Sequence, residues 1–415
     1  MAQGTRERDF ALQVATRLRE AGYQALWAGG CVRDQLLGLI PQDYDVATSA
    51  RPEQVRDLFG HRRTLAIGAA FGVIVVLGRQ SQQIEVATFR SDGAYLDGRH
   101  PTGVTYTTAE ADAQRRDFTI NGLFFDPAEE TVIDYVGGQQ DLKQGLIRAI
   151  GEPSARFSED KLRMLRAVRF ATTFDFQIDP PTLAAVQSMA AEVHVVSAER
   201  IGGELRRLLV HPARKRGLEL LLESGLLAQL LPELAALWQQ QPACWQQTLQ
   251  HLDQLNSDSL AVALATLIAD SRQLALVSEI GRSYRFTNKE IERASWLVLK
   301  LPDIEQSETI PWPKLQRVLV HEGVGDLMDL ADAVLGNAHR GVCHARRRLA
   351  LSPEELDPAP LLTGQDLIAH GVRPGPGFAQ ILEIVRDQQL LGTLGNRQEA
   401  LLLVDQWLER NRGGS

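Results

Sequence analysis

The chain has 415 residues and a formal net charge of −8. No stretch approaches the roughly 20 consecutive apolar residues of a membrane span, and the charged segment from Arg6 to Asp9 lacks the apolar core of a signal peptide. We therefore expect a cytoplasmic protein without a membrane partner. Three scattered cysteines exclude a disulfide framework. Because the net charge is negative, any contact with nucleic acid has to come from local clusters of basic residues.

Hydrophobic periodicity predicts a mixed first third and a helical remainder. In chain order, the first part is expected to contain a helix at 10–21, a strand at 25–28, a helix at 32–37 and strands at 44–47, 72–77 and 83–89. These elements predict an α+β domain with a small mixed sheet flanked by helices. After Pro153, leucine-rich segments of helical period follow, with breaks expected at Asp179-Pro180-Pro181, His211-Pro212, Pro302 and Pro311-Trp312-Pro313.

The change of pattern at Pro153 and a linker at 358–360 predict four consecutive parts. We expect an α+β head at 1–150, followed by an all-α neck at 151–220, body at 221–357 and tail at 358–415. The last helical piece is expected at 363–408.

A glycine pair and an acidic pair follow each other closely in the head. Gly29 and Gly30 let the backbone approach an anion, and the helix expected after them offers its N-terminal amides to phosphate, with Arg33 adding a charge-assisted contact. Asp43 and Asp45 are two residues apart, so in an extended strand both carboxylates project from one face and suit a hard cation such as Mg²⁺. Either pair alone is commonly a turn or a solvated strand end. Together they predict a nucleoside triphosphate bound with its metal.

A helix expected from Ser158 onward presents a second polar row. Asp160, Arg163 and Arg166 are three residues apart and share one helical face. An acceptor next to a donor matches adenine and cytosine, which show an amino group beside a ring acceptor, while guanine and uracil reverse this order. One such pair of side chains would accept ATP and CTP without a nucleic-acid template. The alternative is an ordinary intrahelical salt bridge.

Arg115, Arg116 and Asp117 supply further polar groups. We expect Arg116 to reach the triphosphate and Asp117 to bind a ribose hydroxyl or act on an attacking 3′-hydroxyl. The alternative is an Arg–Asp pair that caps a helix. Glu85 is a candidate third carboxylate near the metals, although a half-exposed strand Glu fits the pattern equally well.

Basic residues are concentrated after residue 200. A charge run is commonly a solvated helix face, but two clusters on a chain with a nucleotide site favour contact with RNA. The second cluster is His344-Ala345-Arg346-Arg347-Arg348. In the first, which also contains Arg200, we expect the RNA-binding residues to be Arg206, Arg207, Arg214, Lys215 and Arg216.

These motifs resemble those of the class II tRNA nucleotidyltransferase and bacterial poly(A) polymerase family. The resemblance covers 28–172 most strongly and includes the segments 84–90, 115–123, 134–138 and 156–170 in the family's order. It implies a head with the polymerase-beta nucleotidyltransferase fold, two Mg²⁺ ions at Asp43 and Asp45, ATP and CTP as substrates, and tRNA as partner through its 3′ end and acceptor arm. It assigns base reading to Asp160 and Arg163, and it puts Arg166 and Arg169 near the phosphates or the head–neck junction.

Three functions stay open at this point. The chain is a template-independent enzyme that adds CCA, or the terminal A only, to tRNA; a poly(A) polymerase; or a non-catalytic RNA-binding protein. The compact segment 90–101 resembles the flexible loop of CCA- and A-adding enzymes and favours the first.

Some family members also carry a metal-dependent HD phosphohydrolase domain. Here Ala269 precedes Asp270 where the motif needs its histidine ligand, so the body is expected to be a degenerate HD-like scaffold, with His251 on a helix surface.

Overall fold

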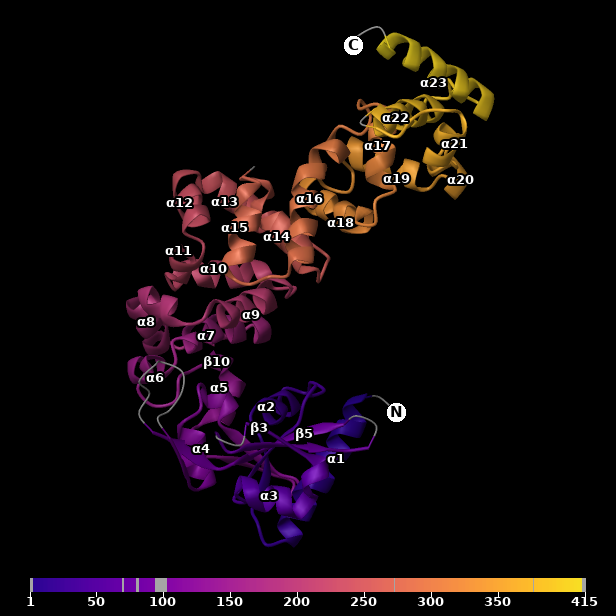
Figure 1. The fold of residues 1–415 in the computed structure, drawn as a ribbon. Coiled ribbons are helices and arrows are strands. Elements are labelled where there is room, and N and C mark those ends of the chain that lie inside the picture. Colours follow the sequence, from indigo (N-terminus) through magenta and orange to yellow (C-terminus); the bar gives the residue numbers. More distant parts are fainter. Residues whose placement is uncertain are drawn as a thin grey trace. The chain divides into compact units, whose positions relative to one another are not determined.

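The computed structural model describes residues 3–68, 71–79, 82–93, 103–271, 273–375 and 377–412. A mixed α/β head is followed by a helical remainder, as expected (Figure 1). The chain divides into two compact units, of which the first extends to Gln241 and includes Ser283–Arg285. The second contains Pro242–Arg282 and the chain from Phe286. The finer division at 150, 220 and 357 stays a prediction.

The head is built on a seven-stranded sheet with the order β3-β4-β5-β2-β1-β8-β9. Strands β2 and β5 are parallel, and the other neighbours are antiparallel. The four strands expected from the sequence correspond to β1, β2, β4 and β5 within one residue at each end. The bounds are β1 Ala25–Ala28, β2 Asp45–Thr48, β3 Thr64–Gly68, β4 Val73–Leu77, β5 Gln83–Thr88, β8 Leu123–Asp126 and β9 Thr131–Asp134. A separate antiparallel pair joins β6 Arg90–Asp92 to β7 Val104–Tyr106.

Helices cover this sheet and supply its core. Helices α1 and α3 pack against its strands and lie on the same side of it in Figure 1. Ala109 and Ala113 of α4 join Leu26, Phe89 and Phe124 in a buried cluster. The helices of the head are α1 Gln3–Glu20, α2 Gly30–Leu36, α3 Pro52–Phe59, η1 His61–Arg63, α4 Ala109–Gln114, η3 Thr119–Asn121 and α5 Gly138–Gln144.

Helices that belong to the same compact unit follow the head. A short parallel pair, β10 Leu146–Ile147 and β11 Gln177–Ile178, joins the end of the head to the turn after α7. Helix α8 begins with two prolines directly after Asp179, which confirms the expected break there. The helices are α6 Pro153–Glu159, α7 Leu162–Phe174, α8 Pro180–Met189, η4 Ala190–Val195, α9 Ala198–Leu209, α10 Arg214–Glu223, α11 Leu226–Leu230 and α12 Pro232–Gln240.

The chain from Pro242 is helical wherever it has regular structure among the described residues. The expected break at Pro302 is wrong, because this proline lies inside α16, within its last turn, where a missing N–H removes only one backbone hydrogen bond. The expected last piece at 363–408 is three helices with a small core of their own around Leu367, Ile381 and Val404. None of the described helices is long and apolar enough to cross a membrane. The bounds are α13 Pro242–Gln254, α14 Leu260–Ala269, α15 Ala275–Ser283, α16 Asn288–Glu305, α17 Trp312–Leu319, α18 Val324–Leu335, α19 Arg340–Leu349, α20 Pro353–Leu356, α21 Gly364–Ala369, α22 Gly377–Leu390 and α23 Arg397–Arg412.

Candidate active site

The turn between β1 and α2 requires glycine. Gly29 has a φ of 71°, which L side chains rarely adopt, and its N–H donates to the carbonyl of Leu123 on β8 at 3.0 Å. A Cβ at Gly29 would also lie 2.9 Å from Nη1 of Arg116. The missing side chain therefore lets the turn lie directly against an arginine that also faces a cavity.

The acidic residues lie at the start of β2. Asp45 is the register partner of Glu85 on the parallel strand β5, and Asp43 precedes the strand. Asp45 remains accessible to water, yet the surrounding strands desolvate its carboxylate, and this effect, followed by repulsion from Glu85, raises its pKa to about 6. Arg116 opposes the shift.

These carboxylates fit a hard divalent cation by their chemistry. They offer only oxygen ligands, and the repulsion among Asp43, Asp45 and Glu85 is what such a cation relieves. The described residues contain no group of three His, Cys, Asp or Glu side chains close enough to hold a metal ion. Asp43 and Asp45 therefore stay the predicted ligands, with Glu85 a candidate beside them.

Asp117 is fixed at the centre of the site. Its carboxylate accepts hydrogen bonds from Arg166 Nε at 2.8 Å and from Asn121 Nδ2 at 3.0 Å. Burial raises the pKa of Asp117, but Arg166 and the hydrogen bond from Asn121 outweigh burial and lower it to about 2. Asp117 is therefore charged at neutral pH, which suits a hydrogen-bond acceptor and makes it a weak general base.

The helix expected from Ser158 is interrupted at Asp160, so that expectation is wrong. Helix α6 ends at Glu159, Asp160 is extended with a φ of −149°, and α7 begins at Leu162. The reason is a local side-chain-to-backbone bond that competes with a continuous helix: the Asp160 carboxylate accepts from the N–H of Leu162 at 3.1 Å. Asp160 and Arg163 consequently do not share one continuous helical face.

Asp160 and Arg163 each have a different ionic partner. Arg200 of α9 donates to both oxygens of Asp160, at 3.1 and 2.7 Å. Arg163 donates to Glu159 at 2.6 Å and to the carbonyl of Arg115 at 3.2 Å. The alternative expectation of an Asp160–Arg163 salt bridge therefore does not describe the structure.

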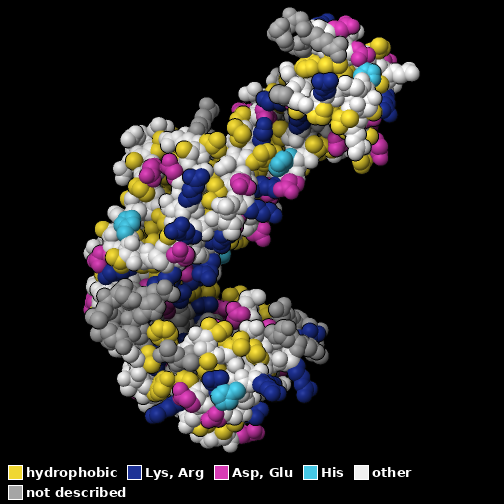
Figure 2. Space-filling view, in the orientation of Figure 1, with side chains coloured by type: hydrophobic (Ala, Val, Ile, Leu, Met, Phe, Trp, Pro, Cys, Tyr) yellow, Lys and Arg dark blue, Asp and Glu magenta, His cyan; other side chains and the backbone are white. Residues whose placement is uncertain are grey.

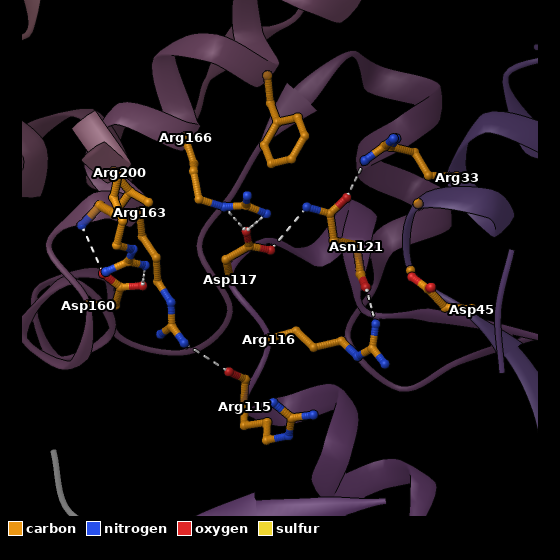
Figure 3. Close-up of a pocket in the computed structure, with 14 residues that line it drawn as sticks. Arg33, Asp45, Arg115, Arg116, Asp117, Asn121, Asp160, Arg163, Arg166 and Arg200 are labelled. Atoms are coloured by element: carbon orange, nitrogen blue, oxygen red, sulfur yellow. Dashed lines mark hydrogen bonds and ion pairs between the residues drawn. The ribbon is translucent and has the colours of Figure 1, made fainter. Parts of the chain in front are cut away.

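A cavity of about 500 Å³ joins these groups (Figure 3). Six arginines and three aspartates line it, an excess of three positive charges that suits an anionic ligand. Figure 3 shows Asp45 on one side and Asp160 with Arg163 and Arg200 on the other. The lining residues are Gly29, Gly30, Arg33, Asp45, Arg115, Arg116, Asp117, Asn121, Asp160, Leu162, Arg163, Arg166, Phe170 and Arg200.

Of the predicted nucleotide- and metal-binding residues, three are not part of this lining: Asp43, Glu85 and Arg169. Arg169 instead pairs with Glu204, and its guanidinium lies 4.0 Å from the centre of the Phe170 ring. This contact joins α7 to α9, which both lie in the expected neck, so the expected role of Arg169 near the phosphates or the head–neck junction stays a prediction.

Sequence reasoning missed three polar lining residues: Arg115, Asn121 and Arg200. Arg115 precedes the predicted Arg116 directly, and Arg200 belongs to the first basic cluster described in the sequence. Asn121 lies four residues after Asp117 and accepts from Arg33 at 2.6 Å, but no spacing rule pointed to it.

The residues expected to bind RNA differ in exposure. The Arg207 side chain is 63% exposed, while Arg206, Lys215 and Arg216 are partly buried. Arg214 is only 2% exposed, and its Nε donates to the carbonyl of His211 at 2.8 Å. The expectation that Arg214 binds RNA is therefore not supported, because its guanidinium is turned into the protein. In Figure 2, basic side chains gather beside the hollow where the neck helices meet the head.

Two further expectations concern regions away from the cavity. His251 is 8% exposed and faces Asp270 at 3.1 Å, so it is a buried partner of that carboxylate and not a surface residue. In the expected loop at 90–101, residues 90–92 form β6, and 94–101 lie outside the described residues.

Comparison with known proteins agrees with this site. Residues 25–148 match the family described as the poly A polymerase head domain, and residues 175–237 match a probable RNA and SrmB-binding site of polymerase A. The head and its cavity therefore define a nucleotidyltransferase. A CCA-adding enzyme of Levilactobacillus brevis is 35% identical over 403 residues, which is 95% of this chain and 97% of that protein. The chain belongs to the CCA-adding enzyme family, a group of tRNA nucleotidyltransferases.

Solved structures give the same result for the fold. The crystal structure of the Bacillus stearothermophilus CCA-adding enzyme in complex with CTP is 30% identical, covers 100% of both chains and has a TM-score of 0.78. A Thermotoga maritima CCA-adding enzyme complexed with tRNA shares the fold at 20% identity, with a TM-score of 0.65 over 96% of this chain and 95% of that one. The expected nucleotidyltransferase fold and enzyme class are confirmed.

Proposed function

We propose that this chain completes the 3′ end of tRNA with CCA, taking CTP and ATP into the cavity between Asp45 and Asp160. One observation carries the proposal: one cavity with an excess of positive charge is lined by Asp45 on one side and by Asp160 and Arg163 on the other (Figure 3). The similar CCA-adding enzyme solved with CTP supports the same ligand class. A tRNA substrate also supports the expected cytoplasmic location.

Asp160 and Arg163 select the base. The carboxylate of Asp160 accepts from the exocyclic amino group of cytosine or adenine, and Arg163 donates to the adjacent ring nitrogen. Their present partners, Arg200 and Glu159, hold both side chains in place without using every acceptor or donor. Because protein side chains do the reading, the reaction needs no template.

Three further arginines of the cavity bind the triphosphate: Arg33, Arg116 and Arg166. The guanidinium of Arg116 lies against the glycine turn and lines the cavity, where it is placed to donate to phosphate. Arg166 lies at the centre of the cavity, where it pairs with Asp117. The carboxylate of Asp117 accepts a hydrogen bond from the ribose hydroxyl. Gly29, Gly30 and Arg33 complete the phosphate side.

Asp43 and Asp45 are the proposed Mg²⁺ ligands, with Glu85 as a further candidate. A cation held by these carboxylates would supply acidification of the 3′-hydroxyl and compensation of the charge on pyrophosphate. The protein orients the nucleotide so that the 3′-oxygen attacks the α-phosphate in line; one P–O bond forms, the bond to pyrophosphate breaks, and the proton of the 3′-hydroxyl passes to solvent. No covalent enzyme intermediate is needed.

The tRNA contacts are proposed on α9 and α10. Arg206, Arg207, Lys215 and Arg216 supply positive charge there for the acceptor arm. The match of residues 175–237 to a probable RNA-binding site supports this surface.

A turnover assay tests the proposed function. The protein is incubated with three tRNA transcripts, ending before CCA, after C and after CC, with CTP and ATP separately and together. We expect two C additions to the first transcript with CTP alone, one A addition to the third with ATP alone, and the full CCA end with both. Addition of A only would assign an A-adding enzyme, and a long A tail on any RNA would assign a poly(A) polymerase.

A further inference from the structure

One buried carboxylate holds two arginines of the cavity although it does not line the cavity itself. Asp112 of α4 has a side chain that is 2% exposed. Its Oδ1 accepts from Arg115 Nε at 2.9 Å and Nη2 at 2.7 Å. Its Oδ2 accepts from Arg116 Nε at 3.2 Å and Nη2 at 3.0 Å. Each oxygen therefore accepts two hydrogen bonds from one guanidinium.

Arg115 and Arg116 also make hydrogen bonds with residues other than Asp112. The third nitrogen of Arg116, Nη1, donates to the carbonyl of Asn121 at 3.2 Å, so the guanidinium is held from two directions. Arg115 Nε also donates to the carbonyl of Arg90 at 3.0 Å, at the start of β6. The carbonyl of Arg115 in turn accepts from Arg163. Arg163 therefore contacts the backbone of Arg115 and not the guanidinium that Asp112 holds, so Asp112 acts on the phosphate side of the cavity.

Electrostatics explains why the carboxylate is needed. Burial raises the pKa of Asp112, but Arg116 and Arg115 outweigh burial and hold it below the ordinary value, so Asp112 is charged. Two adjacent guanidinium groups repel each other, and one carboxylate between them removes that repulsion. One negative charge against two positive charges still leaves the group with a net positive charge toward the cavity.

We propose that Asp112 is a positioning residue, which sets the direction of the Arg115 and Arg116 guanidinium groups before the triphosphate arrives. The proposal rests on the proposed function, in which Arg116 binds phosphate, and it adds Arg115, which lines the same cavity, to the phosphate side. Preorganised donors bind a ligand without having to be ordered during binding. Without Asp112, both guanidinium groups would rotate apart, and the phosphates would lose contacts that the base and ribose do not use.

Comparing CTP with cytidine separates positioning from a general loss of structure. Equilibrium dialysis measures the dissociation constants of CTP and of cytidine for the Asp112→Asn variant. This change keeps one acceptor oxygen and removes the charge. We expect the CTP dissociation constant to rise about tenfold, the effect of losing a charged hydrogen bond, while that of cytidine changes less than twofold. Asp112→Glu should recover part of the affinity, because it restores the charge.

The matched control is Asp126→Asn. Asp126 is also a mostly buried carboxylate of the head, paired with Arg19, and it does not line the cavity. Thermal unfolding of each variant verifies that it is folded at the assay temperature. Equal losses for CTP and cytidine in Asp112→Asn, or the same CTP loss in Asp126→Asn, would overturn the proposal.

A double-mutant cycle tests whether Asp112 acts through the arginines. In an Arg115→Gln/Arg116→Gln background, adding Asp112→Asn should change CTP affinity less than twofold, because its partners are already gone. A full further tenfold loss would show that Asp112 acts otherwise. If Arg115→Gln/Arg116→Gln alone leaves CTP affinity unchanged, the phosphate role of these arginines fails, which is a failure of the proposed function and not of the pairing.

Discussion

Arg200 donates to both carboxylate oxygens of Asp160 across the break between α6 and α7. The pair is bidentate, so it fixes the plane of the carboxylate as well as its position. A carboxylate has about four acceptor directions, which leaves acceptor capacity for a base amino group. Arg200 therefore orients the group that we propose selects the base.

The first prediction concerns base selection. Asp160→Ala should raise incorporation of UTP and GTP relative to CTP and ATP by at least about tenfold, since a correct polar pair is worth roughly 1 to 3 kcal/mol. The change removes a carboxylate that repels a carbonyl and leaves the Arg200 guanidinium free to donate to that carbonyl. The total rate should fall because the base is less well ordered. Single-turnover assays with each of the four nucleotides measure the ratio.

Asp175→Ala is the control for this prediction. Asp175 is an 80% exposed carboxylate at the end of α7 that pairs with Arg216. We expect it to leave the nucleotide preference unchanged. An equal decrease with all four nucleotides in Asp160→Ala would instead mean that the α6–α7 break has only a structural role.

The second prediction uses the raised pKa of Asp45. The carboxyl of Asp45 has a pKa of about 6 in the folded chain and an ordinary pKa of 3.8. Between these two pH values the folded chain binds more protons than the unfolded chain, so the folded state loses stability as pH rises from about 4 to 6. Asp45→Asn without metal should therefore raise the melting temperature by roughly 2 °C at pH 8 and leave it unchanged at pH 4. Calorimetry at both pH values measures this difference.

The rate of nucleotide transfer by the same variant should be more than tenfold lower than that of the parent, since a proposed metal ligand contributes to the transition state more than to folding. Asp57→Asn, at a 75% exposed position on α3, should change neither quantity. If Asp45→Asn is less stable than the parent at pH 8, desolvation and repulsion from Glu85 do not raise the pKa of Asp45 in the folded chain.

The parts of the site predicted from sequence lie within short segments. Gly29 and Gly30 lie at the start of α2, and Asp45 begins β2 within one residue of the expected strand, because spacing alone determines which groups meet over a few residues. The Asp160–Arg200 pair depends on how α9 packs against α7, with 40 residues between the partners. No local period contains that information.

The sequence also did not predict which charged side chains are buried. The basic run after residue 200 indicated a charged surface, but it could not indicate that Arg214 at the start of α10 turns toward the carbonyls of His211 and Val210. His251 is a similar case, because Asp270 provides a buried partner from another helix. Side chains with long apolar stems follow tertiary packing, so composition alone does not decide their exposure.

The third prediction tests the glycine turn. Gly29→Ala adds a Cβ 2.9 Å from Nη1 of Arg116 at a φ of 71°. It should lower kcat/KM for CTP at least about tenfold because the guanidinium is displaced from the phosphates. Its backbone strain should also cost roughly 1 kcal/mol of stability.

Gly22→Ala separates strain from displacement. Gly22 has a φ of 89°, but a Cβ there would have no atom within 4 Å. It should cost similar stability in thermal unfolding and leave kcat/KM within twofold. If both variants lose activity equally, the close approach of Arg116 to the turn has no role in binding the nucleotide.

The last prediction separates an RNA contact from a structural arginine of the same basic cluster. Arg207→Gln should weaken tRNA binding and reduce the dependence of log Kd on log salt by about one unit of slope, because one phosphate contact is lost. Arg214→Gln should instead lower the melting temperature and keep the salt dependence of the parent, because its guanidinium donates to backbone carbonyls. Filter binding at several salt concentrations, with calorimetry of each variant, measures both. An unchanged salt slope for Arg207→Gln would remove this exposed face of α9 from the RNA surface, whereas a reduced slope for Arg214→Gln would mean that the buried guanidinium turns outward when tRNA binds.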